Sequence, residues 1–309
     1  MSIKPIWVEK YRPKTVNGYV FRDEVHRKQI NVWIKEGSIP HLLLSGSPGI
    51  GKTTLAKVLL NELEIPEYDI LELNASRERG IDEVKKRITN FISMIPFGPF
   101  KCVLLDEADR LTPEAQDALK GVMEEYSSTS RFILTCNSPN RIVPAIHSRC
   151  QQMHFASIDQ TEYTARTATI LVEENIEFDL DTLDIYVRSV YPDLRKCINL
   201  LQQNSVGGKL INPKAEDSGV SDYKIEMVEL FKAKKYREAR KLLCAKATAD
   251  EMGEILRWCY DNIELFGTDD ETMDQAVIIL KQGLCDHTIC ADPEVNLSAV
   301  LIKLARINQ

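Results

Sequence analysis

The segment GSPGIGKTT, at residues 46–54, constrains the fold of this chain more than any other feature of its sequence. It fits the pattern G-x-x-x-x-G-K-[S/T] and lies between an apolar run at 41–46 and apolar residues spaced at the helical period at 53–63. In that context the glycines let backbone N–H groups surround an anion, and the start of the helix adds partial positive charge. The sequence therefore predicts a phosphate-binding loop between a strand and a helix.

Two residues of this loop have distinct expected roles. Lys52 is expected to reach the β- and γ-phosphates of a nucleoside triphosphate, and the hydroxyl of Thr53 is expected to coordinate Mg²⁺. The nucleotide-binding residues predicted in the loop are Gly46, Ser47, Pro48, Gly49, Ile50, Gly51, Lys52, Thr53 and Thr54.

Apolar runs and helical patterns alternate through the first half of the chain. Strands are predicted at 41–46, 69–75, 101–107 and 131–137, and helices at 53–63, 81–94 and 113–126. Because the apolar runs are unbroken, both faces of the strands should be buried. The sequence therefore predicts an α/β domain with a parallel sheet covered by helices, over residues 1–157.

The strand signal disappears after about residue 157, and the rest of the chain is predicted to be helical. Three helices, at 159–175, 179–190 and 192–205, indicate a small domain at 158–208. A segment rich in Gly, Ser, Pro and Asp predicts a linker at 209–221. The remaining domain, 222–309, is predicted to hold helices at 222–232, 234–246, 249–265, 270–284 and 292–307.

Polar side chains stand at the ends of two predicted strands. The strand at 101–107 ends in Asp106 and Glu107. Asp106 is expected to meet the Mg²⁺ held by Thr53, and Glu107 to orient or deprotonate an attacking water, which favours hydrolysis over binding alone. Asn137 could position the same water. We interpret Asp109 as a cap of the helix that follows.

Charge and cysteine content narrow the class of protein. The net charge of −7 argues against a simple basic nucleic-acid binder, but residues 1–157 carry 21 Lys and Arg against 19 Asp and Glu, so the acidity belongs to 158–309. The eight cysteines form no C-x-x-C pair, and we expect buried, reduced thiols. No apolar run reaches the ~18 residues of a spanning helix, and no signal core precedes the chain's first motif. We expect a protein that is not secreted, in the cytoplasm or the nucleus.

With these motifs in place, the chain resembles the small ATPase subunit of a sliding-clamp loader, in the AAA+ superfamily. The resemblance covers essentially all of the sequence. It rests on WVEKYRPKTV at 7–16, the loop at 46–54, LLDEADRLTPEAQDAL at 104–119 and HSRCQ at 147–151. Replication factor C small subunits and the phage clamp-loader ATPase are both similar, and the sequence leaves the choice between them open.

The resemblance implies roles for residues outside the loop, and ATP with Mg²⁺ as cofactors. Asn137 matches a sensor of the γ-phosphate, Arg149 an arginine finger acting in trans on the neighbouring subunit's ATP, and Arg195 a second sensor. The alternatives without a role in catalysis are that Arg149 forms a surface salt bridge and that Arg195 is a solvent-exposed residue on a helix surface. The residues implied at the adenine pocket are Val8, Glu9, Lys10, Tyr11, Arg12 and Val20.

The resemblance also implies contacts with DNA and with the clamp. The candidate DNA-binding residues are Arg77, Arg79, Lys85, Lys86 and Arg87, which could alternatively form a solvated helix face. A further hypothesis has Arg79 hold Glu107 inactive until DNA arrives. Clamp contacts are expected at Met94, Ile95 and Phe97, with packing in the core as the alternative.

The function implied is ATP-driven opening of a ring clamp and its loading onto primer–template DNA, with hydrolysis releasing the closed clamp. The implied partners are the clamp, the other loader subunits in a hetero-pentamer assembled through the C-terminal helices, and DNA, with no membrane. Two alternatives stay open. One is an AAA+ translocase or helicase. The other is a non-catalytic assembly subunit, and the residues that count against it are Lys52, Asp106, Glu107 and Arg195.

Overall fold

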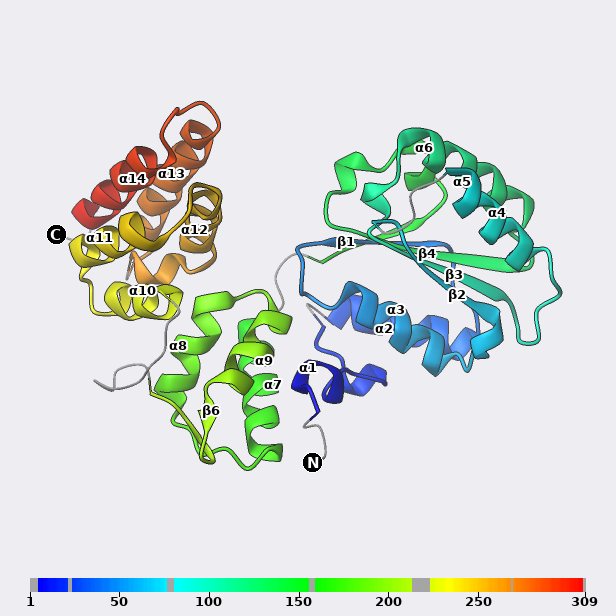
Figure 1. The fold of residues 1–309 in the computed structure, drawn as a ribbon, viewed down its shortest axis with the longest axis horizontal. Helices are drawn as coiled ribbons and strands as arrows, with labels where there is room; N and C mark the ends of the chain where they lie inside the picture. The colour runs from blue at the N-terminus through cyan, green and yellow to red at the C-terminus, as the bar shows by residue number, and fades with distance from the viewer. Residues whose placement is uncertain are drawn as a thin grey trace. The chain divides into compact units, whose positions relative to one another are not determined.

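A computed structural model describes residues 5–21, 24–76, 81–155, 159–212, 223–267 and 269–307 (Figure 1). The chain divides into two compact units, Met1–Arg166 with Pro192–Arg195, and Thr167–Tyr191 with Lys196–Gln309. It therefore passes between the units three times, after Arg166, after Tyr191 and after Arg195. Within the described ranges, no helix has the length and apolar character needed to cross a membrane.

The first unit is built on a five-stranded sheet in the order β2-β3-β4-β1-β5, and every pairing is parallel. The strands are β1 Leu42–Gly46, β2 Ile70–Asn74, β3 Lys101–Asp106, β4 Ser130–Cys136 and β5 Gln151–Phe155. The four predicted strands and the parallel sheet are confirmed. The edge strand β5 was not predicted, because its sequence QQMHF alternates polar and apolar residues and only Met153 and Phe155 are buried.

Helices cover both faces of this sheet, α2 and α3 on one and α4 and α5 on the other (Figure 1). Their bounds are α2 Glu24–Glu36, α3 Lys52–Glu62, α4 Ile81–Ile92 and α5 Pro113–Glu125, with short helices α1 Trp7–Lys10 and α6 Pro144–His147 and 3₁₀ turns η1 Val16–Gly18, η2 Glu67–Asp69, η3 Ala108–Arg110 and η4 Pro139–Arg141. Val84 and Ile88 of α4 and Leu119 of α5 pack on Val103 and Phe132 of the sheet. This core fixes the strand ends that carry the polar residues.

The helical part of the chain agrees with the predicted pattern except at one place. Its helices are α7 Gln160–Glu173, α8 Leu180–Val190, α9 Leu194–Gln203, α10 Tyr223–Lys232, α11 Tyr236–Lys246, α12 Ala249–Asp261, α13 Asp270–His287 and α14 Pro293–Ile307, with η5 at Ile263–Leu265. The expectation of no strand beyond residue 157 is wrong, because β6 Ser205–Val206 and β7 Lys209–Leu210 form a hairpin. Gly207 and Gly208 make its turn with φ of 61° and 81°. Residues 213–221 of the linker expected at 209–221 lie outside the described residues.

Within the second unit, α8 is joined to α10 and to the segment after α12 by polar contacts. Asp184 of α8 pairs with both Arg188 of α8 and Lys232 of α10. Arg188 also pairs with Glu264 at 3.3 Å, and its carbonyl oxygen accepts a 2.5 Å hydrogen bond from the indole of Trp258. Most residues of the helical domains predicted at 158–208 and 222–309 fall within this one compact unit, and their division into two domains stays a prediction.

Candidate functional site

The loop between β1 and α3 has the backbone that the glycine spacing predicts. Gly46, Gly49 and Gly51 have φ of 149°, 75° and 93°. A Cβ built on Gly46 would lie 2.1 Å from the carbonyl oxygen of Phe155, and one on Gly51 3.2 Å from the ring of Tyr19. Only glycine avoids both the strained φ and these contacts, so the loop can turn tightly into the N-terminus of α3.

Lys52, the first residue of α3, links the loop to the end of β4. Its Nζ donates to the carbonyl oxygens of Gly46 at 2.9 Å and Ser47 at 2.7 Å, and to Oδ1 of Asn137 at 2.9 Å. Burial lowers the pKa of Lys52 below its ordinary value, although the charges of Asp106 and Asp109 act in the opposite direction. The structure thus brings together Lys52 and Asn137, two residues that the sequence assigned to the same site.

The carboxylate of Asp106 lies beside the hydroxyl of Thr53, as the predicted metal site requires. Thr53 donates to Oδ1 of Asp106 at 2.7 Å, and Thr135 of β4 donates to the same oxygen at 2.5 Å. A hydroxyl and a carboxylate side by side at the loop are oxygen ligands suited to Mg²⁺. The pair Thr53 and Asp106 therefore fits a magnesium ion next to a bound phosphate.

Thr135 is a functional candidate that the sequence reading missed. Besides donating to Asp106, its hydroxyl oxygen accepts the backbone N–H of Glu107 at 3.1 Å. Glu107 has φ of 56°, in the left-handed region that a non-glycine residue rarely occupies. One hydroxyl thus fixes two neighbouring carboxylate residues. The sequence feature that could have identified Thr135 is its polar side chain near the end of the otherwise apolar run FILTC at 132–136.

Asp109 does not cap the following helix, so that interpretation is wrong. The N-cap of α5 is Thr112, whose hydroxyl accepts the N–H of Ala115 at 3.3 Å. The buried carboxylate of Asp109 instead accepts the backbone N–H groups of Asn137 at 3.3 Å and Ser138 at 3.0 Å. Asp109 therefore ties the segment after β3 to the end of β4, where Asn137 stands.

The residues implied at the adenine pocket surround α1 and the segment after it. Glu9 and Arg12 form an ion pair at 2.6 Å, and the carbonyl oxygen of the buried Tyr11 accepts a hydrogen bond from Arg166 at 2.8 Å. Trp7 of α1 is buried, whereas Val8 and Val20 are half-buried and Lys10 is exposed. Their contact with adenine stays a prediction.

Tyr19, the neighbour of Val20, was not predicted as part of the site. It is buried and packs on the phosphate loop, and its hydroxyl donates to the carbonyl oxygen of Gly51 at 3.4 Å. Burial raises the pKa of Tyr19, so the phenol stays neutral. The residue beside Val20, rather than Val20 itself, supports the loop in the structure.

Arg149 and Arg195 occupy different surroundings. Arg149 follows α6, where it donates to the carbonyl oxygen of Ala145 at 2.7 Å and pairs with Glu124 of α5, so that the Arg149 hydrogen bond lowers the pKa of Glu124. The Arg149–Glu124 pair is the salt bridge that the structural alternative for Arg149 predicted, and it forms within a single chain. Arg195 is an exposed residue in the first turn of α9, and its charge adds to burial in lowering the pKa of Lys52.

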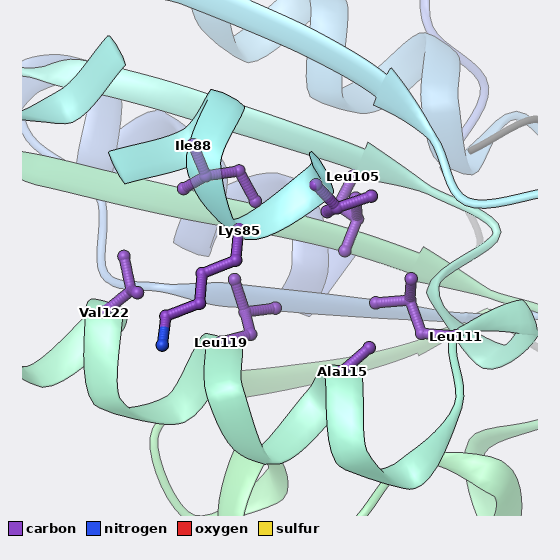
Figure 2. Close-up of a pocket in the computed structure, with 8 residues that line it drawn as sticks. Lys85, Ile88, Leu105, Leu111, Ala115, Leu119 and Val122 are labelled. Carbon is purple, nitrogen blue, oxygen red and sulfur yellow. The ribbon is translucent and has the colours of Figure 1, made fainter. Parts of the chain in front are cut away.

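The candidate DNA-binding residues are only partly described. Arg77 and Arg79 lie outside the described residues, and with them the hypothesis of a contact with Glu107. Lys85, Lys86 and Arg87 are exposed on α4. Figure 2 shows the Lys85 side chain extending from α4 toward α5, where it lines a small apolar pocket with Ile88, Leu105, Leu111, Ala115, Leu119 and Val122. The aliphatic part of the Lys85 side chain therefore packs between α4 and α5.

The candidate clamp-binding residues are exposed. Met94, Ile95 and Phe97 are 62%, 87% and 83% exposed, whereas Ile92 and Phe100, on either side of them, are buried. The alternative that these three side chains pack in the core is therefore wrong.

The cysteines largely follow the expected pattern. Cys102, Cys136, Cys150, Cys197 and Cys259 are buried free thiols, whereas Cys244 and Cys290 are half-buried and Cys285 is exposed.

Comparisons with known proteins agree with this site. Residues 42–157 match the model of the ATPase family associated with various cellular activities. The replication factor C small subunit 1 of Pyrobaculum islandicum is 35% identical over 98% of this chain and 95% of its own length. The replication factor C small subunit of Methanococcus vannielii is 35% identical over 96% of this chain and 98% of its own length. Among solved structures, the Thermotoga maritima RuvB Holliday junction branch migration motor has a TM-score of 0.53 at 16% identity, over 63% of this chain and 64% of that one, a likeness of fold alone.

Proposed function

We propose that this chain is an ATPase subunit of a DNA sliding-clamp loader. The premise is that the chain belongs to the family of replication factor C small subunits, as its similarity over nearly its whole length shows. The observation that carries the proposal is the chain of contacts at the loop. Thr53 and Thr135 converge on Asp106, Thr135 also holds the backbone of Glu107, and Lys52 bonds to Asn137.

The residues of the site divide the work of hydrolysis between them. Mg²⁺ bound with ATP would screen the phosphate charges and polarise the γ-phosphate. The N–H groups of the loop and the ammonium of Lys52 bind the phosphate oxygens, while Thr53 and Asp106 supply metal ligands. Glu107 orients the attacking water and accepts its proton, and Asn137 holds the γ-phosphate side of the site.

Two arginines complete the proposed site. Arg149 acts in trans on the ATP of a neighbouring subunit, where its guanidinium stabilises charge that develops in the transition state. To do so it exchanges its intrachain pairing with Glu124 for the neighbour's phosphate. Arg195 contacts the γ-phosphate from the start of α9, and Tyr11 with Val8 and Val20 lines the adenine pocket.

Among the described residues, the proposed macromolecular contacts are made by exposed side chains. Lys86 and Arg87, together with Lys85 and the arginines at 77 and 79, bind DNA phosphates without reading sequence. Met94, Ile95 and Phe97 dock on the clamp. Residues 158–208 serve as a lid over the nucleotide, and 222–309 form a collar that assembles several loader subunits.

An ATPase assay on the assembled loader tests this function. We expect hydrolysis to be stimulated by primed DNA and clamp together, and to be lost in Lys52→Ala. Stimulation by DNA that is independent of the clamp would instead indicate a translocating motor. Activity that persists unchanged in Lys52→Ala would indicate a non-catalytic assembly subunit.

A further inference from the structure

A fully buried carboxylate anchors the exposed loop that precedes β3. Asp69, the last residue of η2, has no exposed surface. Its Oδ2 accepts the backbone N–H groups of Phe97 and Gly98, both at 2.7 Å, and its Oδ1 accepts from Nζ of Lys101 at 2.9 Å. Three of the possible hydrogen bonds of this carboxylate are thus made to a single loop and its following strand.

Lys101 is the buried counter-charge of Asp69. Its side chain is 3% exposed, and its ammonium lies 4.4 Å from the centroid of the Phe91 ring. The hydrogen bonds from Gly98, Lys101 and Phe97 outweigh burial and hold the pKa of Asp69 below its ordinary value. Two charges taken out of water are costly, and a hydrophobic pair of similar volume would often serve stability as well. What such a pair could not supply is an acceptor for the two loop N–H groups.

Gly98 allows the loop to close on this acceptor. A Cβ built on Gly98 would lie 2.7 Å from Cδ of Pro66 and 3.5 Å from Oδ2 of Asp69. A side chain at this position would push the loop off Pro66 and lengthen the bonds to the carboxylate. The close approach therefore depends on both Gly98 and Asp69.

The anchored loop carries side chains that nothing in the described part of the chain buries. Met94, Ile95 and Phe97 are each more than 60% exposed. Packing of these side chains therefore does not hold the loop in place. The hydrogen bonds from the backbone N–H groups of Phe97 and Gly98 to Asp69 hold it instead.

Tyr68 belongs to the same surface. Its side chain is 79% exposed, and its ring centroid lies 6.2 Å from that of Phe97. Asp69 follows Tyr68 directly in the chain and holds the backbone of Phe97. One buried residue thus fixes the spacing of two exposed aromatic rings that come from different segments.

We propose that Asp69, supported by Lys101, is a positioning residue that holds the loop 93–100 ready for docking, and that Tyr68 is a further docking residue beside Met94, Ile95 and Phe97. The partner is the sliding clamp, so this inference rests on the proposed function. Because the exposed side chains of the loop are apolar, the clamp surface that they would bury is apolar too. A loop ordered in advance loses less conformational entropy on binding, and aromatic side chains that are already spaced can be buried together.

Hydrogen exchange tests the positioning role without any partner. In the wild type, the amides of Phe97 and Gly98 should exchange slowly although their loop is at the surface. In Asp69→Leu/Lys101→Met, which keeps a filled and uncharged core, both amides should exchange rapidly while the thermal midpoint and basal ATPase activity stay close to wild type. Asp69→Asn/Lys101→Met retains one acceptor oxygen and should show intermediate protection. Unchanged protection in the leucine double variant would overturn the positioning role.

Clamp affinity, measured on the assembled loader with a non-hydrolysable ATP analogue, tests the docking role. Asp69→Leu/Lys101→Met should weaken binding by about tenfold, and Tyr68→Ala should weaken it with amide protection unchanged. Val172→Ala, at an exposed apolar residue of the other unit, is the matched control and should bind normally.

The two levels of the proposal separate in these data. If Phe97→Ala weakens clamp binding and Tyr68→Ala does not, Tyr68 is no part of the surface. If none of the variants, Phe97→Ala included, changes clamp affinity, the proposed docking on the clamp is wrong, and the exchange data alone decide the role of Asp69.

Discussion

At the scale of single residues, the geometry of the candidate site depends on two side chains that the sequence analysis did not place in it. Thr135 links Asp106 to the backbone of Glu107, and Asp109 holds the backbone of Asn137. Thr135 extends from β4 to the end of β3, and Asp109 extends from the segment after β3 to the end of β4. These two connections between neighbouring strands hold Asp106, Glu107 and Asn137 in place.

Asp109→Ala should slow hydrolysis with little effect on ATP binding. The substitution removes the acceptor for the N–H groups of Asn137 and Ser138, so the Asn137 amide, which we propose to lie beside the γ-phosphate, loses its fixed position. We expect kcat of the assembled complex to fall about tenfold, or about 1.4 kcal/mol in the barrier, with ATP affinity nearly unchanged. Steady-state kinetics and nucleotide titration measure the two quantities.

Asp109→Asn is the control for this prediction, because its amide oxygen can still accept a hydrogen bond. It should recover most of the lost rate. A loss of ATP affinity at normal kcat in the alanine variant would show that Asp109 serves binding rather than positioning.

Arg149→Ala should separate binding from hydrolysis in a different way. The isolated subunit should bind ATP normally, since the proposed arginine finger would act on a neighbour's ATP, whereas hydrolysis by the assembled complex should fall about 10³-fold. Glu124→Gln removes only the charge that pairs with Arg149 within the chain and should leave hydrolysis high. Equal losses of binding and hydrolysis in Arg149→Ala would rule out action in trans.

Sequence reasoning found the residues that stand at strand ends and missed the ones that connect strands. Lys52, Thr53, Asp106 and Asn137 follow from a spacing rule and from the meeting of parallel strand ends. Thr135 and Asp109 act through backbone N–H groups of another strand, and that pairing depends on a register which the sequence does not display. The same holds for Asp69, whose partners lie 28 and more positions further along the chain.

At the scale of elements, the fully buried strands were predicted, and the elements that were missed bury only part of their residues. The central strands β1, β3 and β4 are buried along nearly their whole length, whereas β5 and α2 bury only a few side chains each. The edge strand β2 was predicted although Leu73 is its only buried residue. In α2 only Ile30 and Trp33 are buried, so its sequence lacks a continuous apolar stripe. The hairpin of β6 and β7 is too short to show any periodicity.

The N-terminus of α12 offers a pH-dependent test at this scale. Glu251 accepts the backbone N–H and the hydroxyl of Thr248, each at 3.0 Å. The pKa of Glu251 is lowered from 4.5 to about 2, chiefly by the hydrogen bond that its carboxylate accepts from the backbone N–H of Thr248. Because the folded pKa lies below the unfolded one, the stabilisation is complete above the unfolded pKa and is lost as the pH falls toward the folded pKa.

Glu251→Gln should therefore unfold more easily than the wild type at pH 7, and the difference should shrink as the pH falls below about 4.5. Chemical denaturation followed at several pH values measures it. A difference that stays constant from neutral to acid pH would show that the charge of Glu251 contributes nothing to the cap.

At the scale of the whole molecule, net charge is a poor guide to DNA binding. The total of −7 combines a nearly neutral N-terminal half with an acidic C-terminal half. The exposed cations of α4 occupy only a small part of that neutral half. Attraction to DNA should therefore come from several copies of α4 brought to one duplex by assembly.

The assembled complex should bind primed DNA far more tightly than the isolated subunit, with a steep dependence on salt. Lys86→Ala/Arg87→Ala should weaken binding to all sequences alike and reduce the slope of log K against log salt by about 2 for each subunit in contact. Fluorescence titration over a range of salt concentrations measures both. Equally tight binding by the isolated subunit would contradict the role of assembly.

The three passages of the chain between its two units have a consequence for dividing the protein into fragments. The first unit contains Met1–Arg166 and also Pro192–Arg195, so it is not one continuous stretch of sequence. A cut after Arg166 would take Pro192–Arg195 away from the first unit, and a cut after Arg195 would take Thr167–Tyr191 away from the second. No single cut of the chain therefore yields two fragments that each contain one whole unit.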